Sequence, residues 1–236
     1  MAALDGKVVL VTGATGNLGQ VVARKFAGQG AKLVLVARNA DDLKALADEL
    51  GGETMTEAAD LGDLESVDAL VKRVEARFGG IDVLAHTVGG YAAGKPVHET
   101  GIDVLEKVIN LNVRPVFVTG GRVAQSMVER GQGGKIVVVL AKSALKGSAN
   151  NGAYTASKAA AQRIVESMAL ELRDQGINVN AVLPSTIDTP QNRKEMPNAD
   201  PAKWVTVDDL ADAILFLASP EAAKVTGTSL EVYGRS

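Results

Sequence analysis

Short unbroken runs of aliphatic residues alternate along this chain with longer segments that have helical spacing. Strand-like runs occur at 8–11, 33–36, 81–85, 136–140 and 177–183. Because these runs contain no regular polar positions, we expect strands that are buried on both faces. Amphipathic segments of helical period lie at 17–29, 40–50, 63–78, 103–130 and 152–174. The alternation predicts a parallel sheet whose crossover helices cover both of its faces.

One weak segment and the last third of the chain complete this pattern. A weak strand is expected at 53–58, a last helix at 206–218 and a last strand at 228–233. No linker, internal repeat or low-complexity tract separates the segments. We therefore predict an α/β fold over residues 1–236, a single-domain, Rossmann-like, doubly wound parallel sheet of about seven strands with helices on both faces.

One segment departs from the rhythm of strands and helices. Four of the seven prolines, at positions 184, 190, 197 and 201, follow the sixth predicted strand. Long loops in compact domains are more often functional than accidental. Residues 184–204 are therefore predicted to form a substrate lid, and the alternative is an irregular connection without a function of its own.

Composition removes several kinds of chemistry. The 236 residues include no cysteine and two histidines, and the net charge is −3. Disulfides, thiolate nucleophiles and cysteine-based metal sites are therefore excluded, and we expect no metal centre. The mild acidity and the lack of charge patterning argue against nucleic acid as a partner. With no run of ~18 apolar residues and no basic-then-apolar leader, we expect no membrane association and a cytoplasmic protein.

A glycine-rich turn joins the first predicted strand to the first predicted helix. Glycine permits the tight turn, the approach of the backbone to a pyrophosphate and the packing of helix on strand, and the helix N-terminus attracts phosphate. The spacing is G-x-x-G-x-x-G, and its position between strand and helix favours a dinucleotide site over a plain turn. The residues expected to contact the cofactor here are Gly13, Thr15, Gly16, Asn17, Leu18 and Gly19.

The end of the second predicted strand indicates which dinucleotide is preferred. A site for NAD usually has Asp or Glu there to bind the ribose 2′-hydroxyl, but this chain has Ala37 followed by Arg38. Because a guanidinium matches the geometry of a 2′-phosphate, NADP (NADPH) is the predicted cofactor, with NAD as the alternative. Arg38 could instead be an ordinary solvated surface residue.

A Tyr-x-x-x-Lys pair begins the helix predicted at 152–174. Tyr154 and Lys158 are four residues apart and therefore share a helix face. A nearby cation favours the phenolate and lowers the pKa of a tyrosine. We expect Tyr154 to donate a proton to the substrate, with Lys158 tuning that proton.

Together, the glycine loop and the Tyr–Lys pair resemble the short-chain dehydrogenase/reductase superfamily, and the resemblance covers essentially the whole chain. It implies a third catalytic residue at Asn112, which would hold a water that relays protons to Lys158, while Lys158 also binds the cofactor ribose. It implies adenine contacts at Asp60 and Leu61. The other cofactor contacts implied by the resemblance are Val88, Gly89, Tyr154, Lys158, Pro184, Thr186, Ile187 and Thr189.

The chain departs from the family pattern in ways that bear on its substrate. The usual catalytic serine lies 13 residues before the tyrosine, and that position is Ala141; Ser143 follows two residues later, where ungapped spacing does not place it in the site. The usual Asn-Asn-Ala-Gly stretch reads His86-Thr87-Val88-Gly89, and the usual Pro-Gly reads Pro184-Ser185. The serine-less site and the segment 183–204 resemble dihydropteridine reductase, a divergent member of the superfamily.

These features lead to an NAD(P)H-dependent reductase of a small-molecule carbonyl or quinonoid/imine substrate, with a dihydropterin-like compound as one candidate. An electron-poor quinonoid ring needs less oxyanion stabilisation than a ketone, which suits a serine-less site. The alternatives are an ordinary 3-oxoacyl or keto-reductase that uses Ser143, and a catalytically silent NADP-binding sensor. The resemblance also implies a homo-tetramer or homo-dimer, because the helices at 103–130 and 152–174 correspond to the family's subunit interface.

Three further features have more than one interpretation. His86 ends a buried strand and is more typical of a hydrogen-bonded structural histidine than of a catalytic one. Trp204 either caps the substrate pocket or anchors the loop on the core. Arg193 and Lys194 either contact an anionic substrate or are simply solvated.

Overall fold

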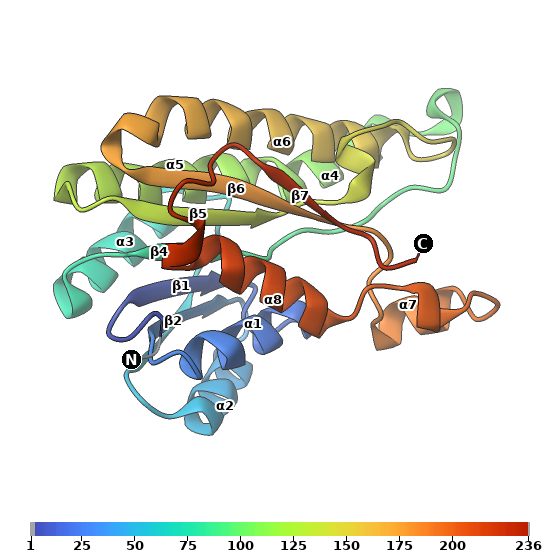
Figure 1. The fold of residues 1–236 in the computed structure, drawn as a ribbon. Helices are drawn as coiled ribbons and strands as arrows, with labels where there is room; N and C mark the ends of the chain where they lie inside the picture. The colour runs from blue at the N-terminus through green and yellow to red at the C-terminus, as the bar shows by residue number, and fades with distance from the viewer. Residues whose placement is uncertain (1–2, 236) are drawn as a thin grey trace.

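The computed structural model describes residues 3–235, in which seven parallel strands form one sheet with helices on both faces (Figure 1). The strands are β1 (Val8–Thr12), β2 (Lys32–Ala37), β3 (Thr54–Ala58), β4 (Val83–His86), β5 (Gly134–Val139), β6 (Ile177–Pro184) and β7 (Ser229–Val232). Their order across the sheet is β3-β2-β1-β4-β5-β6-β7. The chain therefore moves outward from β1 in one direction and resumes at β4 on the other side. This confirms the predicted doubly wound fold, and it places a topological switch point between β1 and β4.

The helices agree with the predicted segments except at two places. They are α1 (Asn17–Ala27), α2 (Ala40–Leu50), α3 (Leu64–Phe78), α4 (Ile102–Asn112), α5 (Arg114–Arg130), α6 (Gly152–Leu172), α7 (Pro190–Glu195) and α8 (Val207–Ala218). The single helix predicted at 103–130 is wrong, because the chain breaks at Val113 between α4 and α5. Pro115 explains the break, since proline has no N–H to donate to the carbonyl of the preceding turn.

The second difference is α7, a short helix inside the proline-rich segment. Thr189 caps this helix by accepting a hydrogen bond from the backbone N–H of Asn192, at 3.2 Å. Pro190 occupies the first helical position, where the missing N–H costs nothing. In Figure 1, α7 lies outside the two helical layers, on the side of the molecule where β6 and β7 end.

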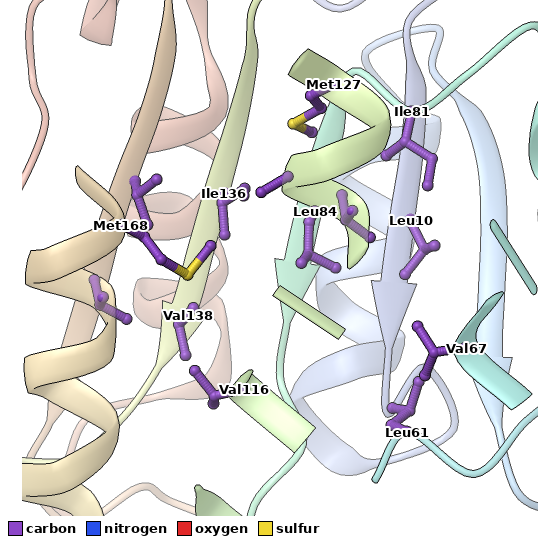
Figure 2. Close-up of a cluster of buried hydrophobic side chains, with 14 of the residues drawn as sticks. Leu10, Leu61, Val67, Ile81, Leu84, Val116, Met127, Ile136, Val138 and Met168 are labelled. Carbon is purple, nitrogen blue, oxygen red and sulfur yellow. The ribbon is translucent and has the colours of Figure 1, made fainter. Parts of the chain in front are cut away.

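The core consists of two layers, one on each face of the sheet. Alternate strand residues such as Leu10, Leu84 and Ile136 pack under α3, α5 and α6, and Figure 2 shows them in one layer with Met127 and Met168. The intervening strand residues pack under α1 and α8 on the opposite face. Because both faces are covered, the strands need apolar residues at successive positions, which explains the unbroken aliphatic runs.

Two short backbone pairings tie down the ends of the segment 184–204. The backbone N–H of Val205 donates to the carbonyl of Thr186 at 3.0 Å, and the N–H of Asp188 donates to the carbonyl of Val205 at 2.7 Å. Trp204 is 8% exposed and therefore buried. Its burial is what an anchor of the segment on the body of the protein requires.

Candidate active site

The glycine loop after β1 presents the N-terminus of α1 to the edge of the sheet. Gly13 has a φ of +66°, a conformation that glycine adopts without strain. A Cβ on Gly19 would lie 2.1 Å from the carbonyl oxygen of Gly13, so only glycine allows the helix to come this close. Gly16 precedes the first helical residue, Asn17, and the first turn of α1 has neither a side-chain cap nor an acidic residue. Its N–H groups and positive dipole end are therefore directed at a phosphate site.

The other predicted residues of this loop lie around that helix end. Thr15 and Leu18 are partly buried, whereas Asn17 is exposed. The side chain of Gln20 donates to the carbonyl of Thr15 at 2.8 Å, which fixes the turn before the helix. The predicted phosphate loop therefore forms one continuous surface at the end of β1.

The predicted adenine and ribose contacts follow β2 and β3. Arg38 is exposed, and no hydrogen bond or ion pair engages its guanidinium within residues 3–235. Asp60 is also exposed, and its carboxylate accepts a hydrogen bond from the N–H of Gly62 at 2.9 Å. The N-cap of α3 is Asp63, whose carboxylate accepts from Ser66 N at 2.8 Å. Asp60 is therefore not needed to cap this helix.

Leu61 contributes to this region mainly through its backbone. Its side chain is buried at 7% exposure, and its carbonyl accepts a hydrogen bond from the hydroxyl of Thr119 on α5 at 3.1 Å. This contact fixes the loop after β3 against α5. The backbone around Asp60 is thus held at the sheet edge, next to the phosphate loop.

Asn112 joins the loop after β4 to α6. Its amide exchanges two hydrogen bonds with the backbone of Gly90, at 2.8 and 3.0 Å. The same amide donates to the hydroxyl of Ser157 at 3.0 Å, and Ser157 in turn donates to the carbonyl of Tyr154 at 2.7 Å. Ser157, which the sequence did not single out, is therefore the link that positions the helix carrying the tyrosine.

Gly89 is the point where Asn112 and Lys158 meet. A Cβ at this position would lie 2.9 Å from Lys158 Nζ and 3.0 Å from Asn112 Oδ1. Any larger residue would therefore push the lysine or the asparagine aside. Val88, beside it, packs against the core layer under α5 and α6.

Lys158 is a buried cation. Its side chain is 5% exposed, and burial lowers the pKa of its ammonium to about 8. No ion pair or hydrogen bond to its Nζ occurs within the described part of the chain. A buried ammonium without such partners is suited to bind hydroxyl groups of a ligand that enters the cleft.

Tyr154 lies one turn before Lys158 and contacts two further side chains. Tyr91 packs against it edge to face, with ring centroids 4.8 Å apart, and the Tyr91 hydroxyl donates to Asn151 Oδ1 at 2.8 Å. Burial raises the pKa of Tyr154, and a hydrogen bond from Ser143 partly offsets the rise. The net direction is opposite to the lowering that the Tyr–Lys spacing predicts, because burial outweighs the favourable contacts of the phenol.

Ser143 is therefore brought to the site that its sequence position did not predict. A short 3-10 turn at Lys142–Ala144 follows β5, and it redirects the chain after Ala141. Ala141 itself is extended, with φ −169°. The hydroxyl two residues farther along thus hydrogen-bonds with the phenol of Tyr154.

The segment after β6 closes the far side of the cleft. Pro184 ends β6, and the N–H of Ser185 donates to the carbonyl of Val232 at 3.2 Å. The carbonyl of Ile187 accepts a hydrogen bond from the Asn192 side chain at 2.8 Å. Arg193 forms two hydrogen bonds with Asp188, at 2.6 and 2.7 Å. This arginine is thus already neutralised, which argues against a role in binding an anionic substrate.

Two kinds of site were sought across residues 3–235. No group of three or more His, Asp or Glu side chains in this range could hold a metal ion. No helix in the same range is long and apolar enough to cross a membrane. The chemistry of the site therefore depends on hydroxyl, amide and amine groups together with an organic cofactor.

Comparison with known proteins identifies the family. The model of the short chain dehydrogenase family matches residues 7–200. The chain belongs to the short-chain dehydrogenase family. The L-rhamnose 1-dehydrogenase (NAD(P)(+)) of Azotobacter vinelandii (strain DJ / ATCC BAA-1303) is 36% identical to it, over 98% of this chain and 96% of the relative. The D-threitol dehydrogenase of Mycolicibacterium smegmatis (strain ATCC 700084 / mc(2)155) is 33% identical, over 98% and 93%.

A solved structure agrees with this assignment. A short-chain type dehydrogenase/reductase from Mycobacterium ulcerans superposes with a TM-score of 0.92 at 26% identity, covering 99% of this chain and 90% of that one. As a short-chain dehydrogenase, the protein is an oxidoreductase of a family that uses NAD(P). The family assignment confirms the resemblance found in the glycine loop and the Tyr–Lys pair.

Proposed function

We propose that this short-chain dehydrogenase is an NADP(H)-dependent enzyme that interconverts a carbonyl compound and its alcohol. The observation that carries the proposal is the hydrogen bond between Ser143 and Tyr154, next to the buried Lys158. The contact supplies a serine hydroxyl beside the phenol although Ala141 occupies the usual serine position. It favours the keto-reductase interpretation over a reaction without serine.

Each polar group then has a role in the reduction. Tyr154 donates its phenolic proton to the substrate oxygen, and Ser143 donates a hydrogen bond to that same oxygen. The cofactor, when bound, supplies the hydride. The ammonium of Lys158 stabilises the phenolate that remains, which matters because burial alone raises the pKa of Tyr154. Asn112 holds a water that passes protons to Lys158.

The cofactor proposal rests on the surroundings of the glycine loop. The uncapped N-terminus of α1 and the close approach allowed by Gly19 suit a pyrophosphate. Arg38 is exposed, and no acidic side chain pairs with it in residues 3–235, so its guanidinium is available for a 2′-phosphate. These features favour NADP over NAD. Asp60 and Leu61 border the adenine, and the backbone of residues 184–189 borders the nicotinamide.

A pocket beside the N-terminus of α6 supports a polar, uncharged substrate. Its volume is ≈ 280 Å³, and it lies between residues 93–104 and residues 150–153. Lys95, Glu99 and Asp103 line it with hydrogen-bond donors and acceptors of both charges, which suits a neutral compound with several hydroxyl groups. The two relatives named for L-rhamnose and D-threitol are consistent with this class.

A second candidate is a quinonoid or imine substrate, with dihydropterin as an example. Ala141 favours it, because this buried residue puts a methyl group where the family usually has a hydroxyl. The segment 184–204 would then act as a lid over a flat ring. Its ends are anchored by Trp204 and by the pairing of Ile187 with Val205.

The decisive experiment compares Ser143→Ala with Ser148→Ala, a matched change in the same loop at an exposed serine. Oxidation of NADPH is measured with ketones, with aldose and ketose sugars, and with quinonoid dihydropterin. If Ser143 donates to the substrate oxygen, Ser143→Ala lowers kcat for the carbonyls by ~10²–10³-fold, while Ser148→Ala does not. Carbonyl turnover that survives Ser143→Ala unchanged contradicts the proposal. Reduction of dihydropterin alone favours the second candidate, and NADPH binding without turnover of any compound indicates a sensor.

The assembly is proposed to be a homo-tetramer or homo-dimer. Phe117 on α5 and Leu170 on α6 are 66% and 67% exposed, although large apolar side chains usually avoid such exposure unless a partner covers them. Both helices cover the same face of the sheet. A second copy of the chain is the partner that the family resemblance favours.

A further inference from the structure

His86 is a buried histidine with one unused ring nitrogen. It ends β4, is 1% exposed, and has its Nδ1 atom 3.1 Å from the hydroxyl of Thr12 on β1. The other nitrogen, Nε2, is completely buried and has no hydrogen-bond partner within residues 3–235. Buried polar atoms without a partner are rare and destabilising, so this atom calls for an explanation.

The surrounding hydrogen bonds determine which nitrogen carries the proton. The hydroxyl oxygen of Thr12 already accepts from the N–H of Thr87 at 3.2 Å, and the carbonyl of Thr12 accepts from the Thr87 hydroxyl at 2.6 Å. The Thr12 hydroxyl proton then has His86 Nδ1 as its acceptor. The ring is neutral, because burial lowers the pKa of His86 to about 3. Its proton is therefore on Nε2, and the unpartnered atom is a donor.

That donor lies under the catalytic lysine. Side chains alternate along a strand, so His86 shares the sheet face of Leu84, which packs under α5 and α6. Val138, its register partner on β5, belongs to the same layer. The charge of Lys158 on α6 also contributes to the lowered pKa of His86, so the ring lies within reach of the ammonium's field.

The groups around the imidazole come from four elements. Thr12 on β1 and Asn112 on α4 are neutral, and α6 contributes the two titratable groups of the site, Tyr154 and Lys158. None of these is an acceptor that already engages Nε2. An acceptor that both Nε2–H and the Lys158 ammonium can share is a water molecule, which has two lone pairs.

We propose that His86 is a positioning residue for Lys158: its Nε2–H donates to a buried water that also accepts a hydrogen bond from Lys158 Nζ. The water's oxygen is then turned toward the ammonium, which stabilises the charged lysine against its burial. The chain Thr87–Thr12–His86–water–Lys158 connects the phosphate-loop end of β1 to the catalytic helix. The inference depends on the proposed function only for the use that Lys158 makes of its charge.

The first test is structural and needs no substrate. In the full-length protein, a high-resolution crystal structure should show density for a water within ~3 Å of both His86 Nε2 and Lys158 Nζ. Nitrogen-15 NMR of the histidine side chains should show His86 in the Nε2–H tautomer across neutral pH. A dry contact, or a proton on Nδ1, overturns the proposal even if the protein turns out to have another activity.

The second test is kinetic and compares His86→Leu with His86→Asn, which retains an N–H donor. Without the shared water, burial lowers the pKa of Lys158 further, so the alkaline limb of the kcat profile moves to lower pH. The expected shift is about half a unit to one unit in His86→Leu, with recovery in His86→Asn. His98→Leu, at the exposed second histidine, controls for loss of an imidazole. An unmoved limb in a folded His86→Leu variant contradicts the proposal, and His86→Asn with the water density decides the matter if that variant does not fold.

Discussion

At the scale of single residues, the site depends on side chains whose environment differs from what their spacing indicates. Tyr154 and Lys158 share a helix face as predicted, yet burial moves the pKa of the phenol up and that of the ammonium down. Both changes oppose the ion pair of phenolate and ammonium in the empty cleft. Binding of ligand hydroxyls to Lys158 would favour its charge again, so the residues are set for a reaction that requires an occupied site.

Arg38 allows a sharp test of cofactor choice at this scale. Arg38→Ala removes a guanidinium that makes no other contact within residues 3–235, so the fold should be unaffected. We expect the Kd for NADPH to rise by about one order of magnitude or more, since a charge-assisted contact to phosphate is lost. The Kd for NADH should change little, because NADH lacks the 2′-phosphate. Both constants are measured by fluorescence titration, and equal weakening of the two cofactors refutes the assignment of Arg38.

At the scale of elements, the phosphate loop depends on the contact between β1 and α1. Gly19 lies in the first turn of α1, and its α-carbon faces the carbonyl of Gly13. The sequence motif predicted this role for glycine, and the structure supplies the reason in one distance. A methyl group cannot be accommodated 2.1 Å from a backbone oxygen.

Gly19→Ala should therefore displace α1 from the loop. We expect loss of measurable NADPH binding and a decrease of ~1–3 kcal/mol in the free energy of unfolding. Gly28→Ala is the matched control at the other end of α1, where the added Cβ would be 3.5 Å from the nearest oxygen and φ is −62°. This control should retain cofactor binding. Urea unfolding and NADPH titration decide the outcome, and a Gly19→Ala protein that binds NADPH normally would show that the loop is not the cofactor site.

At the scale of the whole molecule, the sequence predicts what depends on local pattern and fails where distant segments meet. The aliphatic runs predict the strands, because a sheet covered on both faces requires them. The contact of Tyr91 with Tyr154 joins residues that no local period relates. Ser143 is placed by the 3-10 turn after β5, and counting residues without that turn leaves it outside the site. The break at Val113 was readable from Pro115, but the amphipathic period continues across it and conceals it.

Lys158 connects the site to the stability of the entire protein. Its pKa is about 8 in the folded chain, against 10.5 for the unfolded group. Between these values the unfolded state binds more protons, so this group makes the folded state more stable as pH rises from about 8 to 10.5. Below that range the buried ammonium destabilises the fold. Lys158→Met removes the charge and should therefore stabilise the cofactor-free protein at pH 7.

The size of this effect follows from the shift. The advantage of Lys158→Met over the parent in free energy of unfolding should shrink by about 3 kcal/mol between pH 8 and pH 10.5. Lys224→Met, at an exposed lysine, removes the same charge without the burial and should show no such trend. Urea unfolding at a series of pH values measures both differences. Equal pH dependence in the two variants would mean that the Lys158 ammonium is solvated in the folded protein, and its proposed place beneath the cofactor would have to be abandoned.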